Sequence, residues 1–180
     1  FFPPRFDRDE VWRQLNRIGV RSLPIVVLTA FLVGVIMVIQ VVSYVKATGA
    51  TAFVGAGAGL AVFAELGPAL IGLMFSGRVG ANTTAEFGNM VVSEQMDALR
   101  ALAIDPIKFL VVPRFVGIVV SLVLLTVIGD LFGVLGGAVT SHWLLRIDWR
   151  TYMAGLLEAE LLDAFVVGVV KAFFFGIVIS

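Results

Sequence analysis

Long apolar stretches alternate with short polar segments along the whole chain. A bilayer core about 30 Å thick needs roughly 20 apolar residues of helix to cross it. Four stretches approach or exceed that length: residues 23–45, which carry no charge, residues 47–77, residues 115–145, and residues 164–180, which are still apolar where the sequence stops. The pattern predicts an all-α integral membrane protein, a single domain with four visible spans, and we expect a further C-terminal span beyond residue 180.

The composition agrees with this class of protein. Hydrophobic residues make up 59% of the chain, charged residues 14%, and the mean hydropathy is +1.03, which is typical of membrane proteins. The chain has no cysteine, and its single histidine, His142, has no neighbouring ligand set. We therefore expect no disulfide, metal or other cofactor. A net charge of zero argues against nucleic acid as a partner.

The basic residues predict how the chain is oriented in the membrane. Five arginines precede the first span, and four basic residues lie between residues 78 and 114. The other two connections hold only three basic residues between them. Since basic residues accumulate on the cytoplasmic side, the N-terminus and the central polar block should be cytoplasmic.

Two amphipathic segments flank the predicted spans, and the first lies within residues 1–22. At 100° per residue, Arg13, Arg17 and Arg21 gather on one side of a helix over residues 9–21, opposite Trp12 and Leu15. Such a basic helix usually lies in the headgroup layer. Its role is either anchoring or contact with a partner.

The second amphipathic segment covers residues 84–103, which are predicted to form one cytoplasmic helix. Its polar face and adjoining charge hold candidates for contact with a partner: Glu86, Asn89, Ser93, Glu94, Asp97 and Arg100. Phe87, Val91, Ala98 and Leu102 form the apolar face. Asp105-Pro106 should end the helix, because a residue before proline is pushed out of helical geometry. A solvated loop that happens to be helical is the alternative.

Three ionisable residues lie at predicted membrane depth, where a charge is costly unless it faces a partner or water. Glu65, Lys171 and Asp130 are these residues, and Gly72 and Ser76 fall close to the face of Glu65. Glu65 and Lys171 could line a lipid path. For Glu65 the alternative is a structural hydrogen bond between helices. For Lys171 the alternatives are snorkelling to the interface and pairing with a carboxylate. Asp130 lies among glycines and is expected to be structural.

Arg78 is expected to be structural as well. It follows Glu65 by thirteen residues and falls on roughly the opposite helix face, so the two are not predicted to pair.

Small residues recur at four-residue spacing in the spans, as in Ala30/Gly34, Gly129/Gly133 and Gly168/Ala172/Gly176. This spacing lets helix backbones approach closely in lipid and predicts a tight bundle or dimer. The glycine run at residues 55–59 follows no strand and precedes no lysine–threonine or lysine–serine pair, so it is not a phosphate loop. We interpret it as a flexible turn that enters the second span.

The central block carries a set of motifs that resembles one known family. The motifs are Glu65-Leu-Gly-Pro, Gly77-Arg-Val-Gly, Ala85-Glu-Phe-Gly-Asn-Met, Glu94-Gln-Met-Asp-Ala-Leu, Ile104-Asp-Pro and Val112-Pro-Arg. Together they resemble the MlaE (YrbE) permeases, the membrane subunits of ABC-type lipid transporters that work with MCE-domain proteins. Some members carry an arginine just before the motif glutamate, whereas this chain has Ala64. A headgroup contact assigned to that arginine does not carry over.

The resemblance implies a non-catalytic subunit in the bacterial inner membrane. It implies a homodimer whose subunits each have an interfacial helix and five spans. An ATPase pair would dock on the coupling helix at residues 84–103, and an MCE-domain hexamer would sit on the periplasmic side. In some systems a STAS-domain protein binds the ATPase. The cargo it implies is lipid, phospholipid in the best-known branch.

Two other functions compete with lipid transport by a permease subunit. Glu65, Asp130 and Lys171 could form the proton relay of an ion- or proton-coupled secondary transporter. An intramembrane lipid enzyme is the other, but the chain offers no metal cluster, no cysteine and no serine with a plausible neighbouring base.

Overall fold

The structure is a computed structural model that describes residues 12–49, 53–103, 105–158 and 161–180. All of its elements in these ranges are helical, and several contain wider π-helical turns. In chain order they are η1 (Leu15–Val20), α2 (Arg21–Thr48), α3 (Phe53–Leu60), η2 (Ala61–Leu66), α4 (Gly67–Phe75), η3 (Ser76–Gly80), α5 (Ala81–Val92), α6 (Gln95–Ala101), η4 (Ile107–Val111), α7 (Val112–Leu145), α8 (Trp149–Glu158) and α9 (Leu161–Ile179).

These elements join into four continuous helical runs that are long and apolar enough to cross a membrane. The runs are Trp12–Val42, Phe53–Val92, Val112–Leu145 and Leu161–Ile179. A helix satisfies its own backbone hydrogen bonds, which lipid cannot do, and this is why apolar stretches of such length fold as helices. The prediction of an all-α membrane protein with four visible spans is confirmed.

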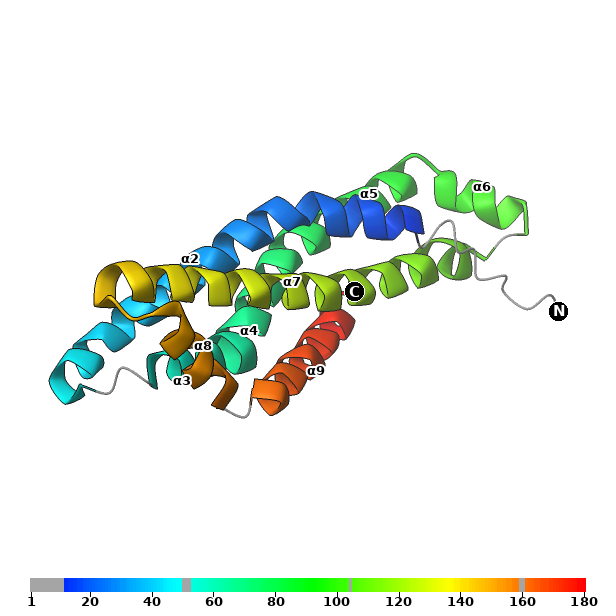
Figure 1. The fold of residues 1–180 in the computed structure, drawn as a ribbon. Helices are drawn as coiled ribbons and strands as arrows, with labels where there is room; N and C mark the ends of the chain where they lie inside the picture. The colour runs from blue at the N-terminus through cyan, green and yellow to red at the C-terminus, as the bar shows by residue number, and fades with distance from the viewer. Residues whose placement is uncertain (1–11, 50–52, 104, 159–160) are drawn as a thin grey trace.

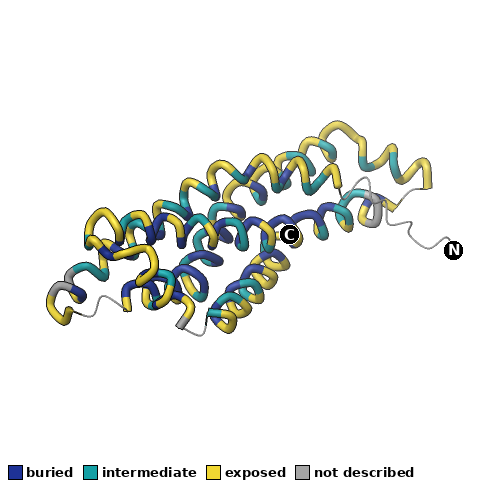
Figure 2. The backbone as a smooth tube through the Cα atoms, in the orientation of Figure 1, coloured by how far each residue is buried: buried dark blue, intermediate teal, exposed yellow. Residues whose placement is uncertain are grey.

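The long helix α7 lies at the centre of the bundle, with α2 along one side and α9 along another (Figure 1). Its buried residues follow the faces turned toward these neighbours, as the dark blue segments of Figure 2 show. Val26, Ile71, Leu122 and neighbouring side chains form one apolar cluster of the core. A second cluster lies toward α8, around Val38, Val54, Ala138 and Tyr152.

Helices α2 and α7 approach closely because small residues face each other. A Cβ built on Gly34 would lie 1.8 Å from the carbonyl oxygen of Gly133, and one built on Gly136 would lie 2.2 Å from that of Phe31. Gly168 and Gly176 of α9 meet Phe63 and Val119 in the same way. The small-residue spacing therefore marks real helix contacts, as predicted.

The described part of the N-terminal segment is helical and joins the first span directly. Residues 12–48 are helical without a break, and η1 continues directly into α2. Pro24 has no N–H to donate to the carbonyl of Val20, four residues back, and the π-helical turn ends at Val20. The helix expected before the first span is therefore continuous with that span. Residues 1–11 lie outside the described part, and the position of residues 1–22 in the headgroup layer stays a prediction.

The single helix expected over residues 84–103 is two helices. Helix α5 continues the second span without interruption, and α6 begins after a turn at Ser93 and Glu94. The backbone of Glu94 is left-handed, with φ of 56°, and the Ser93 hydroxyl donates to the carbonyl of Asn89 at 2.7 Å. A left-handed residue cannot continue a right-handed helix, so the amphipathic pattern crosses a turn.

The glycine run at residues 55–59 is also different from its prediction, since it lies within helix α3. Gly55 packs against α8, where an added Cβ would be 2.1 Å from the carbonyl oxygen of Tyr152. Gly55 and Gly59 thus allow close packing of α3 against α8 rather than forming a turn. The Tyr152 hydroxyl lies against Gly137 of α7, and burial raises its pKa to about 12, so this side chain stays neutral.

We expect Gly34→Ala to destabilise the bundle by about 1–3 kcal/mol or more, because the new methyl group would overlap the backbone of α7. The measurement is thermal unfolding of the purified protein in detergent. Gly57→Ala is the matched control, since a Cβ there meets no atom within 4 Å. Equal stability of the two variants would contradict the close α2–α7 contact.

Candidate functional site

Glu65 and Lys171 form an ion pair between the second and fourth helical runs. The Lys171 Nζ donates to Glu65 Oε1 at 2.9 Å and to the carbonyl oxygen of Ala64 at 2.7 Å. That pairing is one of the alternatives the sequence left open for Lys171. The side chains of Glu65 and Lys171 remain 72% and 39% exposed, so the pair lies at the surface of the subunit rather than in its core.

Both charges lie within helical runs that are long and apolar enough to cross a membrane. Lys171 lies ten residues after the first residue of α9, about 15 Å along the helix axis, which equals half the thickness of a hydrocarbon core of about 30 Å. Glu65 lies in the π-helical turn η2, where the N–H of Gly67 donates to the carbonyl of Val62, five residues back. Such wide turns inside helices frequently mark functional sites.

Helix α9 packs against the helical run that carries Glu65. Lys171 and Phe175 are four residues apart on α9, and they face Glu65 and Gly72, which are seven residues apart. Gly72 is buried under the Phe175 ring, at 3.2 Å from an added Cβ. Gly72 was expected on a lipid path, but in this subunit it packs against Phe175 of α9. Helix α9 lies on the helix face that Gly72 shares with Glu65. Ser76 is exposed.

Asp130 is completely buried, and neither of its carboxyl oxygens has a hydrogen-bond partner among the described residues. Its Oδ1 lies where a side chain on Gly67 would be, 2.4 Å from an added Cβ. Gly67 thus leaves room for the carboxyl, which agrees with a structural setting for Asp130. No hydrogen bond in the described part of the chain joins Asp130 to Glu65 or Lys171, so the proton relay of the competing secondary-transporter hypothesis is not connected in this structure.

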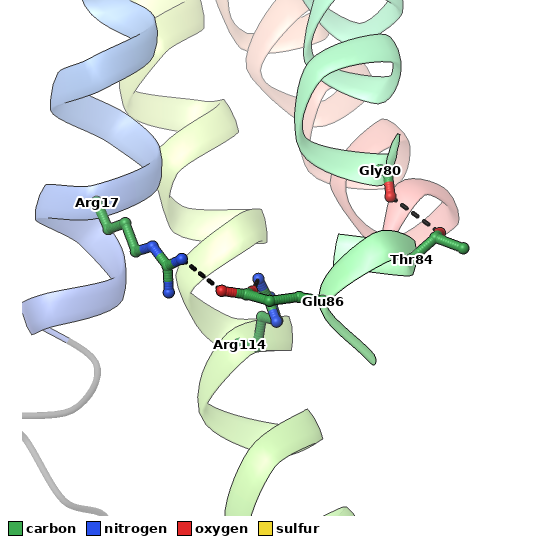
Figure 3. A network of polar contacts seen from close by, with 5 residues as sticks. All are labelled: Arg17, Gly80, Thr84, Glu86 and Arg114. Atoms are coloured by element: carbon green, nitrogen blue, oxygen red, sulfur yellow. Dashed lines mark hydrogen bonds and ion pairs between the residues drawn. The ribbon is translucent and has the colours of Figure 1, made fainter. Parts of the chain in front are cut away.

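A second cluster of charges lies at the end of the bundle that carries the N-terminal helix. Glu86 of α5 accepts a hydrogen bond from Arg17 of η1 through one carboxylate oxygen and from Arg114 of α7 through the other (Figure 3). Arg114 is nearly buried, with its side chain 10% exposed, and its guanidinium lies 5.1 Å from the centroid of the Phe87 ring. We refer to Glu86, Arg17 and Arg114 as the Glu86 cluster.

The Glu86 cluster changes the role expected for Glu86. The helical pattern placed this carboxylate on the face offered to a partner, but it is bound to two arginines of its own chain. Arg114 was not among the predicted site residues. Arg114 and Glu86 both belong to the polar motifs, but they are 28 positions apart in different helices. Helical periodicity does not predict contacts between different helices.

The remaining candidates of the polar block lie at the surface. Ser93, Glu94, Asp97 and Arg100 are exposed, and not one residue of α5 or α6 is buried. Asp97 and Arg100 form an exposed pair at 3.2 Å, which contributes little to stability. The side chain of Arg78, in η3, is exposed and has no ion-pair or hydrogen-bond partner within the described residues.

The structure thus defines a multi-pass helical membrane protein with a paired acid and base at mid-depth and a polar helical extension at one end. A family model described as Permease MlaE matches residues 11–180. The chain belongs to this permease family, as the central motifs predict.

Two bacterial relatives carry the names of transporter permeases. A probable ABC transporter permease protein of Rickettsia typhi is 39% identical over 94% of this chain and 66% of its own length. The intermembrane phospholipid transport system permease protein MlaE of Haemophilus influenzae is 29% identical over 93% of this chain and 65% of its own. The chloroplastic protein TRIGALACTOSYLDIACYLGLYCEROL 1 of Arabidopsis thaliana is 34% identical over 94% and 49%. The chain spans about two thirds of the length of the two bacterial relatives.

We expect Glu86→Gln to lower the free energy of unfolding by about 1.5–3 kcal/mol, the range for a hydrogen bond to a charged group. The change removes the carboxylate charge and leaves two arginines facing each other. Chemical denaturation in detergent measures the loss. Asp97→Asn is the control, expected to cost no more than about 0.5 kcal/mol because its pair is exposed. Equal losses would show that the Glu86 cluster is not structural.

Proposed function

We propose that the chain is the membrane subunit of an ABC-type transporter that moves lipid, with phospholipid as the first candidate cargo. ATP hydrolysis would be supplied by a separate subunit, and this chain would catalyse no reaction. Membership in the MlaE permease family supports the proposal, as do the names of the Rickettsia and Haemophilus relatives.

The Glu65–Lys171 pair is the single observation on which the lipid role rests. A charged pair open to hydrocarbon at mid-membrane depth is unfavourable, so it must face a partner or a polar cavity of the assembly. The surrounding surface of α9 is apolar and exposed, with Phe174 and Val178 among its residues. A polar pair in an apolar wall suits a molecule with a charged head and hydrocarbon chains.

The pair also suits a zwitterionic headgroup in chemical terms. Lys171 could exchange Glu65 for a lipid phosphate, and Glu65 could then accept a hydrogen bond from the lipid amine. Both exchanges replace one charge-assisted hydrogen bond with another. In a homodimer, two such pairs would face a shared cavity.

Coupling to an ATPase would use the exposed charges beyond α5. Helix α5 continues the helical run that carries Glu65. A partner that displaces α6, which follows α5 after a two-residue turn, could therefore move the span that contacts lipid. The Glu86 cluster joins this helical run to the N-terminal helix and α7. ATPase closure would then narrow an outward-facing cavity and expel the lipid.

The placement of partners follows from this scheme. The N-terminal helix and α5–α6 lie at the same end (Figure 1), which supports a common cytoplasmic side for them. The ATPase would dock there in the bacterial inner membrane, with a STAS-domain protein on it in some systems. An MCE-domain hexamer would receive the lipid at the periplasmic end.

Glu65→Gln and Lys171→Gln should each lower lipid transfer by about tenfold, the effect of losing one charge-assisted hydrogen bond worth about 1.5 kcal/mol. Transfer of labelled phospholipid by the reconstituted complex is the measurement. Asp148→Asn, an exposed acid at the other end of the bundle, should keep full activity. Full transfer by both variants, with normal assembly, would exclude headgroup contacts by Glu65 and Lys171.

The energy source is tested separately. Transfer that is abolished by a proton uncoupler and does not depend on ATP would favour the secondary transporter.

Reversing the charges with Glu94→Lys and Asp97→Lys should weaken capture of the ATPase subunit by roughly tenfold, since like charges across an interface are repelled. Co-purification from membranes measures capture, and membrane insertion should be unchanged. Arg150→Glu reverses a charge on α8 and serves as the control. Unchanged capture by the double variant would exclude this docking surface.

A further inference from the structure

A cavity of about 100 Å³ lies where three helical runs meet beside the Glu86 cluster. Its lining is rich in donors and comes from separate parts of the chain: Arg17, Ile18, Arg21 and Ser22 from η1 and α2, Arg78, Val79, Asn82 and Thr83 from η3 and α5, and Arg114 from α7. The lining holds four arginines and no carboxylate. Glu86, which binds two of these arginines, leaves a net charge of four minus one, or +3.

Several donors around this cavity lack an acceptor. Arg114 is 8% exposed, yet its Nε has no hydrogen-bond partner, and neither does the buried hydroxyl of Thr83. Within the described residues, the side chains of Arg21 and Arg78 also have no ion pair or hydrogen bond. Buried donors without acceptors and unpaired neighbouring cations both destabilise a fold. An anion with several oxygen atoms would relieve both.

The cavity lies at the depth where lipid headgroups are found. Arg21 stands two residues before the uncharged stretch 23–45, Arg78 directly follows the uncharged stretch 66–77, and Arg114 directly precedes the uncharged stretch 115–129. Three helices therefore place an arginine at the same boundary between apolar and polar sequence. Basic pockets between membrane helices at this level suit phosphate headgroups.

We infer that this cavity, the arginine pocket, binds a phosphate group, either that of an anionic lipid in the adjoining leaflet or free inorganic phosphate. The planar guanidinium group offers paired N–H donors that match two phosphate oxygens. A space of about 100 Å³ holds several water molecules, and therefore a tetrahedral phosphate. The donors line a small cavity. A phosphate group can enter this cavity more easily than a side chain from the flat surface of a partner protein can.

The arginine pocket is distinct from the Glu65–Lys171 pair. Arg78 follows Glu65 by thirteen residues along one helical run, about 20 Å of axial rise. The pocket is thus an additional site, and its existence does not depend on the proposed transport function. A bound phosphate would tie Arg21 of α2 to Arg78 of η3, two arginines that the Glu86 cluster does not use.

The test is a binding titration of the purified full-length complex in detergent at constant ionic strength. The probes are phosphatidylglycerol, a diacylglycerol with the same acyl chains but no phosphate, and inorganic phosphate. All titrations use the Lys171→Gln background, which removes the phosphate contact proposed at the Glu65–Lys171 pair, so that the remaining binding reports on the arginine pocket. We expect phosphatidylglycerol to bind and diacylglycerol not to. The variant carrying both Arg21→Gln and Arg78→Gln should bind at least about tenfold more weakly. It keeps the Glu86 cluster, so its thermal stability without ligand checks folding. Arg150→Gln is the matched control.

The outcomes separate the two phosphate sources and the rival explanation. Binding of inorganic phosphate as tight as that of the lipid, lost in the double variant, supports the pocket with free phosphate as its source. Unchanged binding in the double variant, or an equal loss in Arg150→Gln, overturns the proposal. Loss of ATPase capture without any change in phosphate binding also overturns it, because the arginines would then contact a protein. Lipid transfer by the double variant with Lys171 intact tests the proposed transport role separately, because that variant keeps the Glu65–Lys171 pair.

Discussion

The close approach of α2 and α7 is the contact from which the other features of this bundle follow. Gly34, Gly133 and Gly136 let the two backbones touch along the middle of both helices. In lipid, where apolar side chains gain little by leaving their surroundings, such packing is a main source of helix association. The same contact brings the N-terminal end of α2 beside that of α7, so that Arg17 and Arg114 can share one carboxylate.

Polar groups in this protein occupy three different physical settings. Asp130 is enclosed beside Gly67, where only the missing side chain of glycine makes room for it. The Glu65–Lys171 pair is open to the surface at mid-depth, which implies an environment supplied by the assembly. The Glu86 cluster and the arginine pocket lie at the polar boundary, where water and headgroups can solvate charge. Depth and exposure together, rather than residue type, separate these roles.

The second helical run contributes to all three settings as one continuous stretch of helix. It carries Glu65 and Gly67 in its middle, Arg78 near the boundary and Glu86 in its extension, with wide π-helical turns at two of these places. The run continues to Val92, and the left-handed Glu94 lies between it and α6. A partner that moves α6 would therefore act on a rod that reaches the membrane centre.

The sequence by itself determined the helical class, the four visible spans, the family and the glycines of the helix contacts, because each depends on local composition, spacing or contiguous motifs. It also selected Glu65 and Lys171 as charges at depth. Only the tertiary structure decided that these two pair, that Gly72 lies under Phe175, and that Glu86 binds Arg17 and Arg114. Helical periodicity assigns a residue to a face of its own helix, but it does not say which other helix covers that face. The turn at Glu94 was missed because an amphipathic pattern can persist across a single left-handed residue.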